Sequence, residues 1–229
     1  MARTSIFNLF DIIVKKIKCL ITAGATREHF DPVRFISNPS TGKMGWHIAK
    51  AAKEIGWQTT LVIGVSPLPN IEGIETIKVV SAQDMLEACQ KKFDDCDILI
   101  MSAAVSDVRP KKKATNKVKK DAIALNPELE RTPDILLTLS KQKKHQILIG
   151  FAAETTDVIE YAKDKLKRKN LDAIVANDVS VENIGFASDI NKIDIICANE
   201  NIISPKLDSK ENLANIIVDF AQKYFIDKR

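Results

Sequence analysis

The sequence lacks any apolar run that approaches the roughly 20 residues needed to cross a bilayer, which argues against a membrane protein. Its start contains several apolar side chains, but Asn8 and Asp11 interrupt them and no small-residue cleavage site follows. A secretory signal peptide is therefore not expected. This N-terminal extension, residues 1–16, is instead predicted to form an amphipathic helix packed on the domain or on a partner chain, because its apolar side chains recur at helical spacing (Ile6, Phe10, Ile13 and Ile17).

Cysteine is scarce and scattered. The four cysteines form no C-x-x-C pair, which argues against a structural zinc site. Cys19 and Cys197 lie in segments that read as buried strands, where a free cysteine behaves as a small hydrophobic residue. Free thiols favour a reduced, cytoplasmic compartment.

Two common phosphate-binding motifs are also missing. Residues 21–46 read ITAGATREHFDPVRFISNPSTGKMGW, an apolar run followed by a polar loop and a helix start. Only Gly24 stands at the strand exit, so the G-x-G-x-x-G fingerprint of dinucleotide-binding proteins is absent. Gly42-Lys43 resembles the end of a P-loop, but Ser37 stands where that motif begins with glycine, and Met44 replaces its Ser or Thr. The pattern predicts an anion-binding strand-to-helix junction of another kind.

Positive charge is concentrated in one segment. Residues 109–121 (RPKKKATNKVKKD) carry a net charge of +6, whereas the whole chain of 229 residues carries +4, so the remainder sums to −2. A generic lysine run is most simply a solvated loop. It could instead close over a triphosphate as a lid. Nucleic-acid binding is a third option, weakened by the absence of interleaved aromatic residues and by the slightly acidic remainder.

Strand-like and helix-like segments alternate five or six times without an internal repeat. This alternation predicts a single α/β domain over residues 17–229, a Rossmann-like, doubly wound and mainly parallel sheet, with a C-terminal β-hairpin that turns at Glu200. Strands are expected at 17–23, 58–64, 74–80, 97–105, 145–153, 172–178, 193–199 and 201–206, with some strand character at 123–129. Helices are expected at 43–55, after a Ser81 cap, from a Thr132 cap to about 141, after a Thr155 cap, and at 211–225.

In such sheets the ligand site lies beyond the carboxyl ends of the strands. The loops 24–42, 106–122, 152–155 and 177–189 should therefore converge there. Asn38 could be a turn residue or could hydrogen-bond a developing oxyanion, and Arg34 suits bidentate anion contacts. Lys165 and Lys169 share a helical stripe, where they could snorkel or grip phosphate.

Other polar side chains give weaker indications of function. Asp107 and Asp178 follow predicted strands, where a carboxylate can bind ribose hydroxyls or magnesium. The three histidines have no metal-ligand spacing, and no Ser-His-Asp or Cys-His nucleophile arrangement is present. From the residues alone, the chain reads as a phosphate- or nucleotide-handling protein, and the reaction stays open.

The sequences of the loops narrow the choice of reaction. The motifs ITAGATRExxDPVRFISNxSxGKMG, SAAVSDVRP, KVKK, TPDIL, GFAAET and VANDVS occur in order from about Lys18 onward. Together they closely resemble the phosphopantothenoylcysteine synthetase family in its bacterial, CTP-dependent form. In many bacteria this ligase is fused behind a flavin-dependent decarboxylase. Only the ligase half is expected here, so the resemblance does not carry the decarboxylase, and a separate decarboxylase protein is a candidate partner.

The family implies a two-step reaction in coenzyme A biosynthesis. The carboxylate of 4′-phosphopantothenate attacks the α-phosphate of CTP, which gives an acyl-cytidylate and pyrophosphate. The amine of cysteine then displaces CMP and forms an amide. Magnesium would bridge the phosphates with few protein ligands of its own, so no metal-binding side chain is assigned. Family members are generally dimers, and the C-terminal hairpin is a plausible interface.

The resemblance also implies roles for individual residues. Asn38 would hold the acyl intermediate, Arg34 and the Ser40–Gly42 helix start would bind phosphopantothenate, and Lys117 would support catalysis and bind CTP. Substrate-binding residues in that helix start are thus Ser40, Thr41 and Gly42. The positions that match CTP-binding residues are Ser102, Ala103, Asp107, Lys117, Pro133, Asp134, Ile135, Leu136, Phe151, Lys165 and Lys169.

Two other classes of protein are compatible with parts of the sequence. A similar sheet could serve an NAD(P)-dependent oxidoreductase, against which the missing glycine fingerprint speaks. The lysine segment could make the protein a non-enzymatic nucleotide or nucleic-acid binder, in which case its affinity would depend steeply on salt. The interpretation favoured here is a ligase with small-molecule substrates and neither a nucleic-acid nor a membrane partner.

Overall fold

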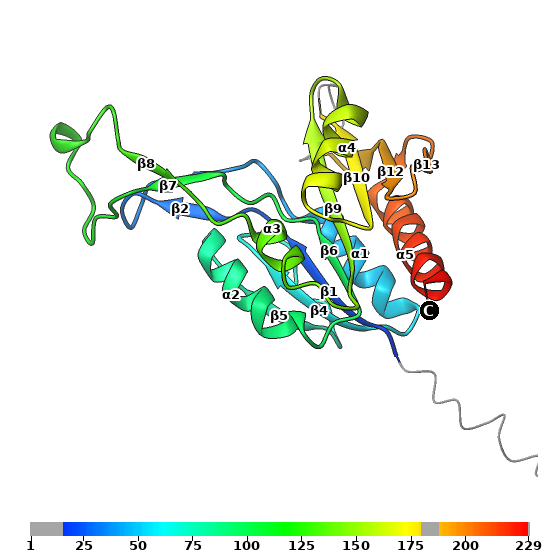
Figure 1. Ribbon diagram of the computed structural model, residues 1–229. Helices are drawn as coiled ribbons and strands as arrows, with labels where there is room; N and C mark the ends of the chain where they lie inside the picture. The colour runs from blue at the N-terminus through cyan, green and yellow to red at the C-terminus, as the bar shows by residue number, and fades with distance from the viewer. Residues whose placement is uncertain (1–15, 180–187, 229) are drawn as a thin grey trace, which may run out of the picture.

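The computed structural model describes residues 16–179 and 188–228, and an eight-stranded sheet forms its centre (Figure 1). The strand order is β13-β12-β10-β9-β6-β1-β4-β5. The six strands from β10 to β5 run parallel, whereas β12 pairs antiparallel with both β10 and β13, which confirms the predicted mainly parallel sheet. The strands are β1 (Lys18–Ala23), β4 (Gln58–Ile63), β5 (Glu75–Lys78), β6 (Ile98–Met101), β9 (Ile147–Glu154), β10 (Ala173–Asp178), β12 (Ile193–Cys197) and β13 (Ile202–Ile203).

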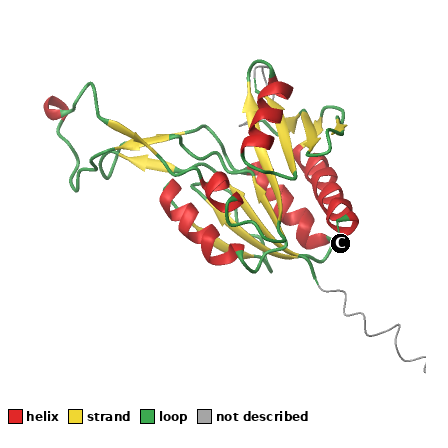
Figure 2. Cartoon of the chain, viewed as in Figure 1, coloured by secondary structure: helices red, strands yellow, loops and turns green. Residues whose placement is uncertain are grey.

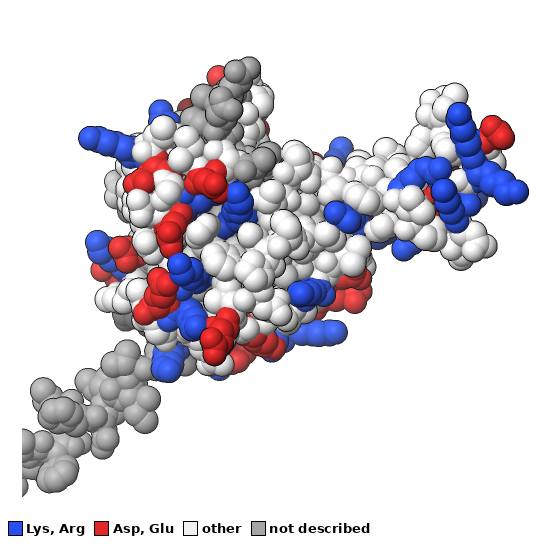
Figure 3. Space-filling view, turned by 180° about the vertical axis from the view of Figure 1, so that it is seen from behind, with Lys and Arg blue, Asp and Glu red and all other residues white. Residues whose placement is uncertain are grey.

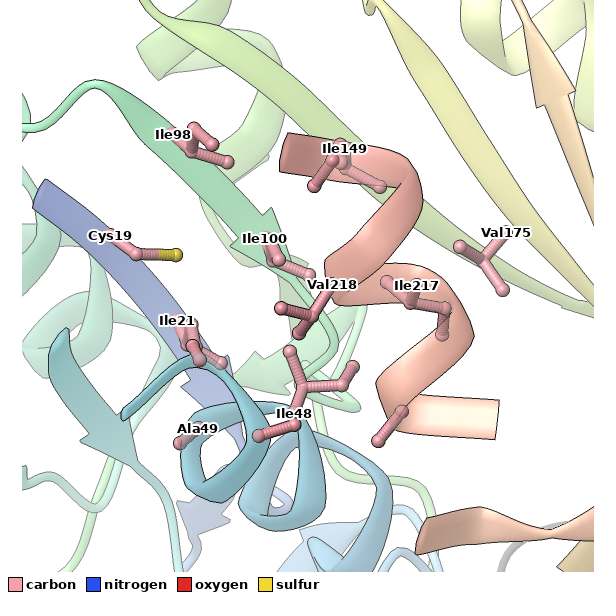
Figure 4. Close-up of a cluster of buried hydrophobic side chains, with 14 of the residues drawn as sticks. Cys19, Ile21, Ile48, Ala49, Ile98, Ile100, Ile149, Val175, Ile217 and Val218 are labelled. Atoms are coloured by element: carbon pink, nitrogen blue, oxygen red, sulfur yellow. The ribbon is translucent and has the colours of Figure 1, made fainter. Parts of the chain in front are cut away.

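Helices cover both faces of this sheet (Figure 2). They are α1 (Lys43–Glu54), α2 (Ala82–Phe93), α3 (Ile135–Ser140), α4 (Val158–Arg168) and α5 (Lys210–Asp227). Alternate side chains of β1 face opposite sides: Cys19 and Ile21 pack with α1 and α5, whereas Leu20 packs with α2, α3 and α4. Figure 4 shows Ile48 of α1 and Val218 of α5 beside Ile21 and Ile100 in the first of these cores.

Several local predictions are confirmed. Helix α1 begins at Lys43, and Gly56 follows its end with a φ of 88°, a conformation that favours glycine. Ser81 caps α2 by accepting a hydrogen bond from the Asp84 N–H, and the Asp84 carboxylate accepts the Ser81 N–H in return. The C-terminal hairpin pairs β12 with β13, and Glu200 turns it with a φ of 70°.

Other local predictions are wrong. The strand expected at 97–105 covers only Ile98–Met101, because the Ala103 N–H donates to the Thr22 side chain and no longer to a backbone carbonyl, although Ala104 still forms an isolated parallel bridge with Ala25. The segment 123–129 contributes only the first residue of β8 (Leu129–Arg131). Asp134, not Thr132, caps α3 through a 3.0 Å hydrogen bond from the Leu137 N–H, while the Thr132 hydroxyl donates to the carbonyl of Ser106. Helix α4 is preceded by Asp157, not Thr155.

An arm that projects from the domain was not expected (Figure 1). It contains two short antiparallel hairpins, β2 (Arg27–His29) with β3 (Phe35–Ser37), and β7 (Val108–Pro110) with β8. The loops after β1 and β6 thus both run out along the arm, and Lys and Arg side chains gather at its far end (Figure 3). A further small pairing joins β11 (Ile190–Asn191) to β14 (Asp208–Ser209), and a 3₁₀ turn covers Lys120–Ala122.

The predicted N-terminal amphipathic helix and part of the 177–189 loop lie outside the described residues. In residues 16–179 and 188–228, no helix combines the length and the apolar character that crossing a bilayer requires. All four cysteines are buried free thiols, as the two strand positions suggested.

Candidate active site

Two adjoining cavities lie beyond the carboxyl ends of the central strands and together form one cleft. Five residues border both, and they mark where the cavities meet: Ala103, Val105, Asp107, Phe151 and Lys165. We call the larger cavity, of about 370 Å³, the α1 lobe, because the first residues of α1 line it. The smaller, of about 270 Å³, is the α3 lobe, lined by residues 131–136 and Lys169.

The start of α1 gives the α1 lobe its polar wall. Gly42 precedes the helix with a φ of 83°, and no side chain caps the helix. The first N–H groups of a helix have no partner within it and favour an anion. Gly45 lets this end approach β1 closely, because a Cβ there would lie 2.6 Å from the Cβ of Ala23 and 2.8 Å from the carbonyl oxygen of Thr22.

Two lysines and a carboxylate organise the α3 lobe. Lys169 is 8% exposed, and its Nζ donates to Oδ1 of Asp134 at 2.7 Å. Lys165 donates from Nζ to the carbonyl oxygen of Phe151 at 2.8 Å. Burial and the neighbouring Lys169 charge lower the pKa of Lys165. An anionic ligand that entered this lobe would relieve that unfavourable concentration of positive charge.

The boundary between the lobes is formed by the loops after β1 and β6. Asn38 donates from Nδ2 to the carbonyl oxygen of Val105 at 3.1 Å. The Ala103 N–H donates to the Thr22 hydroxyl at 3.1 Å, which fixes the backbone directly after β6. Asp107 is exposed and borders both lobes. Polar groups from two parallel strands therefore meet where the two cavities join.

Most of the residues named from the sequence line this cleft. The α1 lobe holds Asn38, Ser40, Gly42 and Ser102, the α3 lobe holds Pro133, Asp134, Ile135, Leu136 and Lys169, and Ala103, Asp107, Phe151 and Lys165 border both. Thr41 is not a lining residue, and its carbonyl oxygen accepts a hydrogen bond from Ser66 at 2.7 Å. The structure thus brings these positions together, while their roles stay predictions.

Arg34 and Lys117 do not line the cleft of their own chain. Arg34 lies on the arm, where its guanidinium donates to Oδ2 of Asp31 at 2.5 Å and to the carbonyl oxygen of Val118 at 3.1 Å. Burial acts to raise the pKa of Asp31, but hydrogen bonds from the Arg34, Val33 and Val118 N–H groups and from the Arg34 guanidinium lower it well below its usual range. Lys117 is exposed next to Val118. The expectation that all of the 106–122 loop lies at the sheet edge is therefore wrong, because β7 carries the lysines outward.

Sequence reasoning missed several polar residues of the α1 lobe. Lys43 and Lys210 are the first residues of α1 and α5, and Asn177 and Asn191 come from β10 and β11. The Asn177 Oδ1 is buried without a hydrogen-bond partner among the described residues. A lysine at the start of a helix is ordinarily predicted to be exposed to solvent, so the sequence did not indicate Lys43 or Lys210. Asn177 could have been predicted to line the site, because it lies at the carboxyl end of a strand.

The cleft offers few carboxylates to a divalent cation, so a magnesium ion there would be held mainly by the phosphates of a bound ligand. Mg²⁺ keeps several waters and takes one or two protein carboxylates beside phosphate oxygens. Asp107 can supply such a carboxylate, whereas Asp134 is engaged by Lys169 and the Leu137 N–H. Across residues 16–179 and 188–228, no group of three or more His, Cys, Asp or Glu forms a metal cage.

This arrangement defines an α/β protein with a two-lobed cleft lined by lysines and by an uncapped helix start, and comparison with known proteins identifies its family. The family model described as the DNA/pantothenate metabolism flavoprotein C-terminal domain matches residues 14–224. The coenzyme A biosynthesis bifunctional protein CoaBC of Bacillus subtilis is 50% identical over 177 residues, and that of Vibrio cholerae is 44% identical over 210 residues. The chain belongs to this family, and the resemblance to phosphopantothenoylcysteine synthetases is confirmed.

Solved structures agree with this assignment. The crystallised C-terminal domain of a CoaBC protein has a TM-score of 0.79 and 41% identity, and the match covers 92% of this chain and 96% of that one. A Cab2 mutant in complex with phosphopantothenate-cysteine shares the fold, with a TM-score of 0.71 at 15% identity. The sequence matches cover 77% and 90% of this chain but only 44% and 52% of the two CoaBC proteins, so the chain spans about half the length of these relatives.

Proposed function

We propose that the chain is a phosphopantothenate–cysteine ligase that uses CTP, acts through an acyl-cytidylate intermediate and serves coenzyme A biosynthesis. Its family and its 50% identical relative, a coenzyme A biosynthesis bifunctional protein, support the pathway and the ligase class. The observation that carries the proposal is the division of the cleft. Most positions matched to the nucleotide border the α3 lobe, although Ser102 borders only the α1 lobe and Lys117 lies on the arm. Ser40 and Gly42 of the helix start matched to the acid line the α1 lobe, and Asn38 donates to the carbonyl oxygen of Val105, which borders both lobes.

The chemistry needs such a division because a carboxylate is a poor acyl donor. In the first step a carboxylate oxygen of the acid forms a bond to the α-phosphorus of CTP, and the bond to pyrophosphate breaks. Lys165 and Lys169 would hold the nucleotide in the α3 lobe and offset its negative charge. Asp107 would help to hold a magnesium ion, which would supply positive charge to offset the negative charge of the departing pyrophosphate.

In the second step the amine nitrogen of cysteine attacks the acyl carbon, the bond to the CMP oxygen breaks, and the amine loses a proton. Negative charge then develops on the acyl oxygen. The Asn38 amide, which donates to the Val105 carbonyl at 3.1 Å in the absence of substrate, would donate to that oxygen instead. The Oδ1 of Asn177, which has no hydrogen-bond partner within residues 16–179 and 188–228, would give the α1 lobe an acceptor for a donor group of a substrate.

The arm supports the further proposal that two chains form one working unit. Arg34 and Lys117 match functional positions of the family, yet both lie on the arm. A second copy could place its arm across the cleft and supply them. The arm also carries an apolar-lined cavity of about 520 Å³ between Phe30, Phe35, Val118 and Ile123, and its exposed apolar side chains include Val33 and Leu125. Such a surface is typical of an interface.

The arm therefore replaces the C-terminal hairpin as the favoured interface. In β13 the apolar side chains Ile202 and Ile203 are 43% and 42% exposed, but β13 adds no position that the family matches to the site. A symmetric dimer through the arms would complete both clefts at once.

Pyrophosphate release tests the proposed activity. The purified protein is supplied with magnesium, 4′-phosphopantothenate and either CTP or ATP, and cysteine is added afterwards. Release that needs the acid and favours CTP, followed by amide formation on cysteine addition, would support the proposal. Lys165→Met should weaken nucleotide use. Lys163→Met is the matched control, because Lys163 is a partly exposed lysine on the same helix that does not line the cleft. Absence of release with either nucleotide would contradict the proposed ligase.

A further inference from the structure

Glu28 is a buried carboxylate on the arm to which neither the family resemblance nor the proposed reaction assigns a role. It is the middle residue of β2 and is 4% exposed. Its Oε1 accepts the N–H of Ala82, the first residue of α2, at 2.7 Å. A carboxylate is rarely buried without a partner, and this hydrogen bond provides one. Figure 1 shows that the arm leaves the domain beside the start of α2, so Glu28 joins the two.

Helix α2 does not depend on Glu28 for its own cap. The Ser81 hydroxyl accepts the Asp84 N–H at 3.1 Å, and the Asp84 carboxylate accepts the Ser81 N–H at 2.9 Å. This box leaves the Ala82 N–H for a partner from elsewhere, and Glu28 supplies it from 54 residues away in the sequence. The helix dipole favours a negative charge at this end. Because the helix start is already capped, the Glu28 bond serves mainly to attach the arm.

The other hydrogen bonds at this joint lie close by. The Arg27 N–H donates to the carbonyl oxygen of Val80 at 2.7 Å. The hydroxyl of the buried Thr26 accepts the Ser106 N–H at 2.9 Å, which ties the two hairpins of the arm to one root. A cavity of about 760 Å³ lies at the joint between residues of the arm and the start of α2, so side-chain packing does not fill it. The direction of the arm therefore depends on hydrogen bonds, of which the Glu28 bond is charge-assisted.

We propose that Glu28 is a positioning residue that sets the direction of the arm, so that Arg34 and Lys117 reach the cleft of a second copy. The inference rests on the proposed function for the dimer and for the roles of those two residues. A displacement of about 1 Å can cost a positioned group most of its effect on a reaction. Glu28 lines neither lobe of the cleft, so it acts through the arm and not by contact with substrate.

Hydrogen exchange of the Arg27 amide, followed by NMR, measures the joint without any substrate. Glu28→Ala should raise this exchange rate by at least about tenfold, because the arm then opens away from α2 more often. Glu28→Gln keeps an acceptor oxygen and should restore most of the protection. Glu87→Ala is the matched control, since Glu87 is an exposed glutamate on α2. An unchanged Arg27 exchange rate in Glu28→Ala would overturn the inference.

A second variant removes the same hydrogen bond from the side of the helix. Ala82→Pro deletes the N–H that Glu28 accepts, and proline is well tolerated as the first residue of a helix. It should raise the exchange rate of the Arg27 amide as Glu28→Ala does. This variant decides the question if Glu28→Ala does not fold, and an unchanged rate would again overturn the inference.

Mixed dimers show which cleft Glu28 serves. Glu28→Ala alone should turn over at least about tenfold more slowly than the unsubstituted protein. Mixed with Asn38→Asp, which has a disabled cleft but an intact arm, it should regain about a quarter of full activity. Mixed with Arg34→Ala, which has a disabled arm, it should stay near its own low level. Recovery with Arg34→Ala and not with Asn38→Asp would show that Glu28 serves its own cleft, and would overturn the inference.

The two measurements separate this inference from the proposed function. Faster exchange of the Arg27 amide in a protein that releases no pyrophosphate would support the joint and refute only the proposed ligase. Recovery in neither mixture would refute the proposed pairing of two copies, and the exchange rate would then decide whether Glu28 fixes the arm.

Discussion

The Nζ of Lys169 lies 2.7 Å from Oδ1 of Asp134, and this contact joins the end of α4 to the start of α3 across the α3 lobe. The same Oδ1 accepts the Leu137 N–H at 3.0 Å. Burial acts to raise the pKa of Asp134, but the contacts with Lys169 and Leu137 lower it. One carboxylate therefore both begins a helix and fixes a lysine that faces the predicted nucleotide position.

Replacing Asp134 should destabilise the fold. Asp134→Ala removes the α3 cap and leaves the largely buried Lys169 without this partner, so the unfolding free energy should fall by about 1–3 kcal/mol. Asp164→Ala is the control, because its contact with Arg168 is exposed and worth little. Urea denaturation measures both, and an equal loss in the two variants would refute the structural role of Asp134.

Asn38→Asp should abolish ligation and leave the fold intact. The exposed side chain loses its donor to Val105, and a carboxylate in its place would repel a developing acyl oxyanion. Turnover should fall by at least about a hundredfold, as for loss of an oxyanion donor, while the denaturation midpoint stays unchanged. Single-turnover kinetics with the unsubstituted protein as reference measure the loss. Normal turnover in this variant would remove Asn38 from the mechanism.

Complementation tests whether the arm acts on a second copy. Asn38→Asp disables the cleft and Arg34→Ala disables the arm, so each variant alone should be nearly inactive. Random mixing makes half of the dimers mixed, each with one intact cleft beside one intact arm, and about a quarter of full activity should return. An arm that served its own cleft would leave the mixture inactive, as would a protein that remains monomeric.

The lowered pKa of Lys210 should be visible in the pH dependence of the unfolding free energy. Its pKa in the folded protein is about 8, below the ordinary 10.5, so the unfolded chain binds more protons between these values. The unfolding free energy of the unsubstituted protein should therefore rise with pH across this window relative to Lys210→Met. Lys43, Asp189 and His47, the titratable groups around Lys210, are shared by both proteins. Parallel curves from pH 8 to 10.5 would show that Lys210 titrates normally.

The sheet could be predicted from the sequence because its strands are buried on both faces. Segments such as β1 and β9 read as continuous apolar runs, and the α2 capping box is explicit in Ser81 and Asp84. The arm could not be predicted, since β2, β3, β7 and β8 have three residues each and lie in polar segments. Periodicity over three residues carries no signal.

The candidate site likewise could be predicted only in part from the sequence. Lys165 and Lys169 could be paired from their helical spacing, and they do meet at one cavity. Lys117 and Arg34 follow the same strands as the cleft residues, and sequence order could not show that two hairpins carry them away. Lys210 was missed because burial of a lysine depends on packing against α1, which is distant in sequence.

The transfer of labelled oxygen tests the central claim most directly. 4′-Phosphopantothenate with ¹⁸O in its carboxylate is incubated with the protein, magnesium, CTP and cysteine, and the released CMP is analysed by mass spectrometry. An acyl-cytidylate requires that one carboxylate oxygen leave with CMP, so CMP should carry a single ¹⁸O. Label in inorganic phosphate with release of CDP, or product formed with unlabelled CMP, would contradict the account.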